Sequence, residues 1–382
     1  MAQQRKTVLV AHPSPDLYGS DLQLLETVTG FVDAGWRVVV TIPEEGPLLP
    51  LLAERGAEIL VIPVPVLRKA LLHPRRILGF LRDTVTATLG GRRLLRKIRP
   101  QIVWVNTLTI PVWQLAALAA RTRSVVHVHE AEEDGSRIVR TALVSPLFLA
   151  KIGVVNSKAA TRAITDVLPP LKNKLELVYN GVPGPEGETT PRPAQEGPTH
   201  IALVGRLSPR KGTDVALEAA AQLRSQGYNI HLDLYGAIFP GYEWYEKELR
   251  ERAAKEDLAG AVTFHGYVRP VWNSLAAADI VIVPSRVEPF GNVAVEAQLA
   301  YRPLVVSAVQ GLVEIVTDGV NGLHAQPESG SDLARALKEL LDDPERAAEL
   351  ARAGYENSTS RFTVERYQQE VARVLAQAAD AK

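Results

Sequence analysis

The sequence has 382 residues, of which 46% are hydrophobic and 23% charged, with 43 basic residues balanced by 43 acidic ones. This length can bury two cores, and the composition excludes a disordered chain. The absence of cysteine excludes disulfides and thiolate metal sites. No apolar run reaches the roughly 18 residues of a membrane span, and no signal peptide is recognisable in residues 1–11, so we expect a cytoplasmic protein.

The first half alternates short apolar strands with helical patterns. A strand at residues 7–11 is followed by a Gly-containing turn and an amphipathic helix at 21–34. The further strands are expected at 36–42, 58–62, 101–105, 124–128, 152–155 and 175–179. This alternation predicts a parallel sheet covered on both faces, within a first domain of residues 1–182.

A segment dense in Pro and Gly, residues 183–199, is the predicted linker. The same pattern restarts in residues 200–361, the predicted second domain. Its strands are expected at 200–204, 230–235, 262–264, 279–283 and 304–307. Residues 362–382 carry apolar residues at the spacing of one helix face, which predicts a C-terminal helix. Both domains are therefore predicted to be doubly wound α/β units.

The zero net charge hides an asymmetry between the halves. Residues 1–182 hold 23 Lys and Arg against 15 Asp and Glu, whereas the remainder holds 20 and 28. Such a split indicates that the two halves have different partners.

The most informative motif follows the predicted strand at 279–283. A loop carries Glu288, and Gly291 opens a helix that contains Glu296. A loop that runs into a helix N-terminus presents N–H groups and a positive dipole to a diphosphate. The alternative is an ordinary α/β unit with two surface carboxylates, and two Glu residues taken alone would favour it.

The string Glu288-Pro-Phe-Gly-Asn-Val-Ala-Val-Glu296 resembles the donor motif of retaining glycosyltransferase family 4. That family includes bacterial polysaccharide, lipopolysaccharide and phosphatidylinositol glycosyltransferases. The resemblance implies the GT-B fold: two Rossmann-like, doubly wound domains face a central cleft, and the C-terminal helix crosses back to the first domain.

The resemblance also implies roles for residues of the donor site. Arg206 and Lys211, in a strand–loop segment at 203–212, match cations that neutralise the leaving diphosphate, where fixed positive charge lowers the barrier. A solvated surface is the alternative for an isolated Arg and Lys. The resemblance further implies that Glu288 contacts the sugar. It assigns the diphosphate to Gly291, Asn292 and Val293, and the nucleoside to Glu296 and Val268.

Two positions depart from the family pattern. Gln310 stands where a Gly commonly precedes Gly311, and Arg302 replaces a Gly before Pro303. Neither change removes a charged group from the proposed mechanism.

The first domain supplies candidates for the acceptor side. By resemblance, a His at the end of the strand at 124–128 contacts the sugar or supports transfer; His129 matches best, and His127 is the competitor because both should point the same way. Gly19 and Ser20 resemble the family's first Gly-rich loop, near phosphate and acceptor. The acidic run 130–134 is expected to be a solvated loop.

Residues 68–99 are strongly basic. They also carry an apolar stripe at i+4 spacing, made of Ile77, Leu81, Val85 and Leu89. Such a segment fits an anionic membrane surface. The alternative is an amphipathic helix whose stripe packs on its own sheet. Nucleic acid is disfavoured because aromatic side chains are nearly absent. The basic residues assigned to the patch are Arg75, Arg76, Arg92, Arg93, Arg96 and Lys97.

The predicted function is a retaining glycosyltransferase that moves a sugar from a nucleoside-diphosphate sugar to a hydroxyl acceptor. The acceptor is expected to be a lipid-linked or cell-surface glycan precursor, with a soluble small molecule as the alternative, and the enzyme to lie in the cytoplasm, peripheral on the inner face of the plasma membrane. No cofactor or metal is expected, since no Asp-x-Asp motif is present. The alternatives are a UDP-sugar 2-epimerase of the same architecture and a non-catalytic nucleotide-sugar-binding protein.

Overall fold

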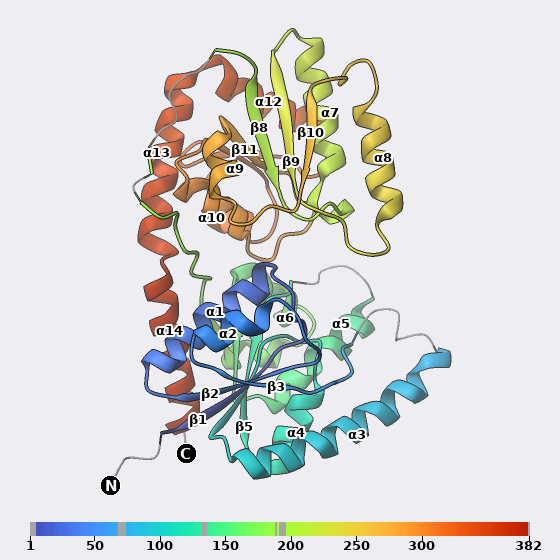
Figure 1. Cartoon of the computed structure of the whole chain (residues 1–382), viewed down its shortest axis with the longest axis vertical. Coiled ribbons are helices and arrows are strands. Elements are labelled where there is room, and N and C mark those ends of the chain that lie inside the picture. The colour runs from blue at the N-terminus through green and yellow to red at the C-terminus, as the bar shows by residue number, and fades with distance from the viewer. Residues whose placement is uncertain (1–4, 68–73, 132–135, 188, 191–195, 381–382) are drawn as a thin grey trace. The chain divides into compact units, whose positions relative to one another are not determined.

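The computed structural model describes residues 5–67, 74–131, 136–187, 189–190 and 196–380, with the side chains of 74–78, 80 and 81 left out. The chain divides into two compact units: residues 1–181 together with 364–382 form unit 1, and residues 182–363 form unit 2 (Figure 1).

Unit 1 is built on a seven-stranded, entirely parallel sheet with the order β3-β2-β1-β4-β5-β6-β7. The strands are β1 (Thr7–Ala11), β2 (Arg37–Ile42), β3 (Glu58–Val61), β4 (Ile102–Val105), β5 (Arg123–Val128), β6 (Ile152–Val155) and β7 (Leu175–Leu177). Alternate residues of β1 supply two cores: Val8 and Val10 face one, and Leu9 and Ala11 face the other. The sheet is therefore buried on both faces, which explains the continuous apolar runs.

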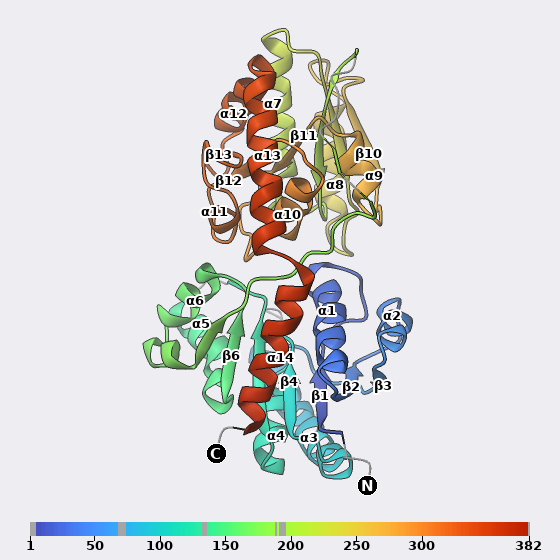
Figure 2. The same cartoon turned by 90° about the vertical axis from the view of Figure 1, so that its left-hand side faces the viewer.

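Helices cover both faces of this sheet. They are α1 (Gly19–Asp33), α2 (Leu48–Glu54), α3 (Pro74–Ile98), α4 (Val112–Ala120), α5 (Arg137–Val144), η2 (Ser145–Leu149), α6 (Lys158–Thr165), η3 (Pro169–Lys174) and α14 (Val364–Asp380). Figure 2 shows α14 lying beside α1, and the two helices are in contact. The Tyr367 hydroxyl on α14 lies 2.5 Å from Thr27 Oγ1 on α1. The last helix thus completes a core that begins at the N-terminus.

Unit 2 has a six-stranded parallel sheet with the order β10-β9-β8-β11-β12-β13. The strands are β8 (Thr199–Val204), β9 (Ile230–Tyr235), β10 (Val262–Gly266), β11 (Ile280–Val283), β12 (Leu304–Ser307) and β13 (Leu323–Ala325). The helices are η4 (Pro209–Lys211), α7 (Thr213–Ser225), α8 (Glu243–Ala253), α9 (Trp272–Ala277), α10 (Asn292–Leu299), α11 (Leu312–Ile315), α12 (Gly330–Asp342) and α13 (Pro344–Arg361).

Two doubly wound parallel sheets were predicted, and the structure confirms them. The sequence prediction missed β13, a three-residue strand that is too short to show a period. None of the described helices is long and apolar enough to cross a bilayer.

Candidate functional site

The charged site of unit 2 is built around an ion pair between two loops. Lys211 follows β8 in η4, Glu288 follows β11, and the Lys211 ammonium donates to Glu288 Oε2. Ser285 Oγ donates to the same oxygen at 3.2 Å. Burial alone would raise the pKa of Glu288, but Lys211 and Arg210 hold it below its ordinary value. Glu288 is therefore a buried, ionised carboxylate.

A glycine next to Lys211 allows these two loops to approach. Gly212 has φ +69°, and a Cβ at this position would lie 1.9 Å from the Pro284 carbonyl oxygen. Only a residue without a side chain fits a backbone that is both left-handed and this close to its neighbour. Gly212 thus fixes the spacing between the loop of Lys211 and the end of β11.

The backbone of Glu288 is held by a residue that departs from the family pattern. The Glu288 N–H donates to Gln310 Oε1 at 3.0 Å, and the Gly311 N–H donates to the Glu288 carbonyl at 3.0 Å. Gln310 itself has φ +37°, in the region where glycine is the easier residue. The second departure, Arg302, is buried and donates to the Leu275 carbonyl at 3.0 Å. Both substitutions have structural partners.

The N-terminus of α10 lies directly after the Glu288 loop. Gly291 has φ +115°, and a Cβ there would lie 2.6 Å from Leu312 Cδ2. Asn292 and Val293, both half-buried, are the first two residues of this helix. The N–H groups at the start of a helix point out of its N-terminal end. Glu296 lies one turn later. Burial raises its pKa to about 7, against the opposing charges of Lys211 and Arg269.

The other two residues assigned to the donor site lie on neighbouring loops of unit 2. The Arg206 guanidinium stacks on the Phe239 ring, 3.5 Å from its centroid. Val268, half-buried, follows β10. The end of β10 is anchored by His265, which lies 2.7 Å from Asp233 Oδ1 through Nε2.

In unit 1, a chain of buried polar side chains ends at His129. Asp21 Oδ1 lies 2.8 Å from His12 Nε2, His12 Nδ1 lies 3.0 Å from Asn106 Nδ2, and Asn106 Oδ1 lies 3.0 Å from His129 Nε2. His12, Asn106 and His129 follow β1, β4 and β5, and Asp21 lies in the first turn of α1. His12 and Asn106 were not predicted from the sequence as site residues, although their position at strand ends is the same signal that selected His129. Asp21 belongs to the predicted Gly-rich turn, but its link to His12 was not predicted.

The structure distinguishes the two candidate histidines. His127 is fully buried, packs against Trp104 and Tyr367, and neither of its ring nitrogens has a hydrogen-bond partner among the described residues. Burial, with His129 adding to it, lowers its pKa well below the ordinary value. His129 is only half-buried and is therefore the more accessible of the two.

The predicted Gly-rich loop forms the start of α1. Gly19 and Ser20 are its first residues, and the Tyr18 N–H donates to Asp21 Oδ2 at 2.9 Å. The loop is therefore tied to the same carboxylate that hydrogen-bonds to His12.

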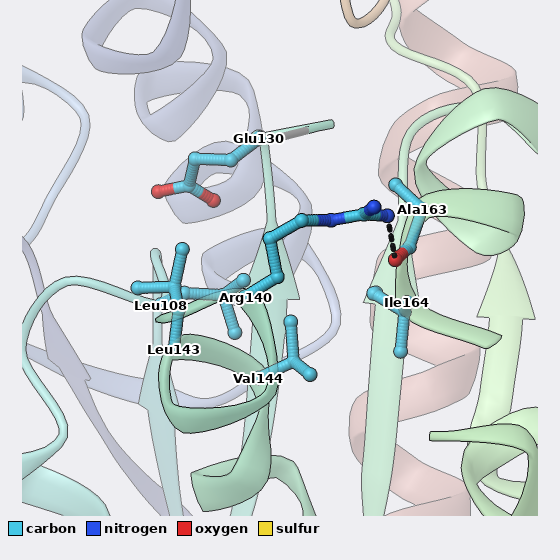
Figure 3. A pocket seen from close by; sticks show the side chains of 7 residues that line it. All are labelled: Leu108, Glu130, Arg140, Leu143, Val144, Ala163 and Ile164. Atoms are coloured by element: carbon cyan, nitrogen blue, oxygen red, sulfur yellow. Dashed lines mark hydrogen bonds between the residues drawn. The ribbon is translucent and has the colours of Figure 1, made fainter. Parts of the chain in front are cut away.

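The expectation of a solvated loop at 130–134 is wrong for Glu130; residues 132–134 lie outside the described residues. Glu130 is half-buried and accepts from the Thr107 hydroxyl and the His129 N–H. Burial raises its pKa, against these hydrogen bonds. It lines a small pocket in which Arg140 reaches across to the Ala163 carbonyl (Figure 3).

The basic residues lie on α3. Arg93, Arg96 and Lys97 are exposed, and Arg92 is half-buried, donating to the Ala119 carbonyl at 3.0 Å. The side chains of Arg75 and Arg76 lie outside the described part of the chain. In the apolar stripe, Val85 and Leu89 are 60% and 49% exposed, so at these positions it does not pack on its own sheet; the side chains of Ile77 and Leu81 are not described.

Comparisons with known proteins agree with this architecture. A family model for glycosyl transferases group 1 matches residues 188–357, and one for a glycosyl transferase 4-like domain matches residues 19–166. Glycogen synthase from Mycobacterium tuberculosis is 33% identical over 201 residues, covering 52% of this chain and 47% of that protein. D-inositol 3-phosphate glycosyltransferase from Corynebacterium aurimucosum is 31% identical over 277 residues, covering 68% and 65%.

The aligned part of the chain thus spans about half the length of the first of these relatives. Among solved structures, Anabaena HepE in complex with UDP and glucose superposes with a TM-score of 0.80 at 23% identity, covering 97% of this chain and 99% of that one. At this identity the similarity shows the fold. The chain belongs to the group 1 glycosyltransferases and has the GT-B fold.

Proposed function

We propose that this protein is a retaining glycosyltransferase that uses a nucleoside-diphosphate sugar as donor and a hydroxyl group as acceptor. The observation that carries the proposal is the partly buried Lys211–Glu288 pair, adjacent to the N-terminus of α10 in unit 2. Family membership supports the same reaction class. The binding of UDP and glucose by the similarly folded HepE supports a nucleotide sugar as the donor.

Each group of the site has a role in this proposal. Lys211 and Arg206 would stabilise the negative charge that develops on the departing diphosphate, together with the amides at residues 291–293. Glu296 would accept hydrogen bonds from ribose hydroxyls, and Val268 would lie against the base. Glu288, already ionised, would accept from the sugar.

The proposed reaction retains the anomeric configuration and requires no metal. The described residues of the donor site include cations that can replace a metal as the counter-charge of the diphosphate. The family resemblance suggests attack from the same face as departure, with the leaving phosphate accepting the acceptor's proton. His129 would contact the transferred sugar or support its transfer, and the loop at Gly19 and Ser20 would lie near the donor phosphate and the acceptor.

The decisive experiment is a panel of UDP-, GDP- and dTDP-sugars scored by thermal shift and by slow hydrolysis. One nucleotide sugar should raise the melting temperature and be hydrolysed with retention at the anomeric carbon, followed by NMR. Lys211→Ala and Glu288→Gln should abolish turnover, whereas Lys247→Ala, an exposed lysine on α8, should leave it unchanged. Full activity in both site variants would overturn the assignment of the site.

The same panel distinguishes the alternative functions. Conversion of UDP-N-acetylglucosamine to its 2-epimer, without release of UDP, would identify an epimerase. Binding without turnover, in the presence of a broad set of acceptors, would identify a non-catalytic nucleotide-sugar-binding protein.

We further propose that the acceptor is a lipid-linked or cell-surface glycan precursor and that α3 holds the enzyme against the anionic inner face of the plasma membrane. The exposed Val85 and Leu89, on the same helix as Arg93, Arg96 and Lys97, support this proposal. Each cation near an anionic surface contributes about 1 kcal/mol.

Liposome sedimentation tests the membrane proposal. The protein should sediment with vesicles containing phosphatidylglycerol and stay in solution with phosphatidylcholine alone. Arg93→Glu with Arg96→Glu should abolish sedimentation, whereas the matched double change Lys247→Glu with Lys255→Glu in unit 2 should not. Binding that is independent of anionic lipid would contradict the proposal.

A further inference from the structure

The hydrogen bonds between the buried side chains that lead to His129 all run in one direction from donor to acceptor, towards Asp21. A carboxylate only accepts hydrogen bonds, and the two oxygens of the Asp21 carboxylate lie 2.8 Å from His12 Nε2 and 2.9 Å from the Tyr18 nitrogen. His12 Nε2 must therefore carry a proton. In a neutral imidazole the other nitrogen is then an acceptor, so His12 Nδ1 receives a hydrogen bond from the Asn106 Nδ2 group at 3.0 Å.

The amide passes this direction on to His129. Because the Nδ2 group of Asn106 donates to His12, its Oδ1 faces His129 Nε2 at 3.0 Å and can only accept. His129 is thus held as the Nε2–H tautomer, and its Nδ1 carries a lone pair. The orientation of the amide in the middle agrees with the direction that the carboxylate sets at the end.

The surroundings favour a neutral His129. Burial lowers its pKa to about 3, with His12 acting in the same sense and Asp21 opposing. His12, Asp21 and Asn106 are almost completely buried, so water does not compete with their hydrogen bonds. His129 itself remains half-buried, and no hydrogen bond to its Nδ1 is formed within the described residues.

We propose that Asp21, His12 and Asn106 are positioning residues that present His129 Nδ1 as a fixed hydrogen-bond acceptor, so that the substrate group it meets is a hydroxyl. A carboxylate at that position of the substrate would face a lone pair and be rejected, and a deoxy analogue would leave the nitrogen without a partner. The hydroxyl belongs either to the transferred sugar or to the acceptor. This inference rests on the proposed glycosyl transfer.

The tautomer itself can be measured without any activity. Long-range proton–nitrogen NMR of ¹⁵N-histidine-labelled wild-type protein at pH 7 should show His129 protonated at Nε2 only, assigned by loss of its signals in His129→Gln. Asp21→Asn replaces the carboxylate with an amide that can also donate to His12. The preference of His129 for the Nε2–H tautomer should therefore be lost. Asp16→Asn removes a carboxylate from the loop before α1 that takes no part in these hydrogen bonds, and it should leave the tautomer of His129 unchanged. A wild-type His129 that is protonated at Nδ1, or at both nitrogens, overturns the proposal.

Kinetics identify the source of the hydroxyl. Asp21→Asn and Asn106→Ala should lower kcat/KM for transfer by about 10- to 100-fold, the effect of misplacing a group by a fraction of an ångström. Hydrolysis of the nucleotide sugar without acceptor should fall equally if the hydroxyl is the sugar's, and be unchanged if it is the acceptor's. In either case the preference of the wild type for a hydroxyl substrate over its deoxy analogue should shrink towards one in Asp21→Asn. An undiminished preference would contradict the inference.

The two levels of failure are distinguishable. If no nucleotide sugar is turned over, the proposed function fails while the NMR measurement still reports on the tautomer. If turnover is present and the tautomer is wrong, only the positioning role fails.

Discussion

The polar sites of the two units hold their side chains by different physical means. In unit 2, a buried carboxylate is kept ionised by the Lys211 ammonium, and close loop packing at Gly212 brings the two side chains together. In unit 1, the Asp21 carboxylate is linked to His129 through two neutral groups, the imidazole of His12 and the amide of Asn106, in a chain of hydrogen bonds.

This difference matches the chemistry proposed for each site. A diphosphate needs fixed positive charge, which must be balanced by a carboxylate when no ligand is present. A hydroxyl needs only an oriented acceptor, which a neutral imidazole supplies. The stability and activity of the charged site should therefore depend on keeping both members of each ion pair. Those of the neutral site should depend on the donor-to-acceptor direction of its hydrogen bonds.

The largest effect should come from breaking the ion pair of unit 2. Lys211→Met leaves Glu288 buried without its cation, and we expect the free energy of unfolding to fall by about 3 kcal/mol and transfer to drop at least 100-fold. Lys211→Met combined with Glu288→Gln should recover most of the stability but no activity, as measured by urea unfolding and by turnover. A double variant as unstable as the single one would mean that Lys211 stabilises by packing and not by charge.

Gly212→Ala should be the next most damaging change, because it affects the spacing of the same two loops. The new Cβ would lie 1.9 Å from the Pro284 carbonyl oxygen, so the loops must separate, in addition to the strain of a φ of +69°. We expect a loss of about 2 to 3 kcal/mol in the free energy of unfolding and a weaker response of the melting temperature to nucleotide.

Gly227→Ala is the matched control for this change. Its φ is +91°, but nothing lies within 4 Å of the new Cβ. It should therefore show the backbone strain alone, about 1 kcal/mol. Equal effects at the two positions would exclude the close approach as the cause.

The stabilities of the two units should depend on pH in opposite directions. Unit 1 should lose stability in acid. The pKa of His129 is lowered to about 3 and that of His127 well below its usual 6.5, so the unfolded chain binds protons that the folded chain does not. Stability is complete above pH 6.5 and is lost as the pH falls towards 3, by about 2 kcal/mol at pH 5 for His129. Hydrogen exchange followed by mass spectrometry should show unit 1 opening first on acidification, and His129→Gln should reduce this response. An acid response confined to unit 2 would contradict it.

In unit 2 the sign reverses at Glu296. Its pKa is raised to about 7, so the folded state binds more protons than the unfolded state, and stability falls as the pH rises from 4.5 to 7. Glu296→Gln should therefore be more stable than the wild type at pH 8 by up to about 3 kcal/mol, and nearly equal at pH 4.5. The same change should weaken nucleotide binding. Glu248→Gln, on the exposed face of α8, serves as the control in urea unfolding at both pH values and should show no such difference.

The residues of the charged site are easier to group from the sequence than those of the neutral site. Glu288 and Glu296 lie within one strand–loop–helix segment, so their proximity follows from local structure. His12, Asn106 and His129 meet only because β1, β4 and β5 are neighbours in the sheet, an order that periodicity does not reveal. The choice between His127 and His129 likewise depends on Tyr367, which comes from the far end of the chain and packs over His127.

The smallest effect should come from the hydrogen bond between Tyr367 on α14 and Thr27 on α1. Tyr367→Phe removes the hydroxyl that lies 2.5 Å from Thr27 Oγ1, but Thr27 also donates to the Gln23 carbonyl at 3.0 Å and so keeps a partner. The loss should therefore be about 1 kcal/mol, the net value of a single buried hydrogen bond. Thr27→Val instead leaves the Tyr367 hydroxyl buried without that partner and should cost about twice as much in urea unfolding. Equal losses would mean that α14 is held by its apolar face alone, and that the position of His127 beneath Tyr367 does not depend on this hydrogen bond.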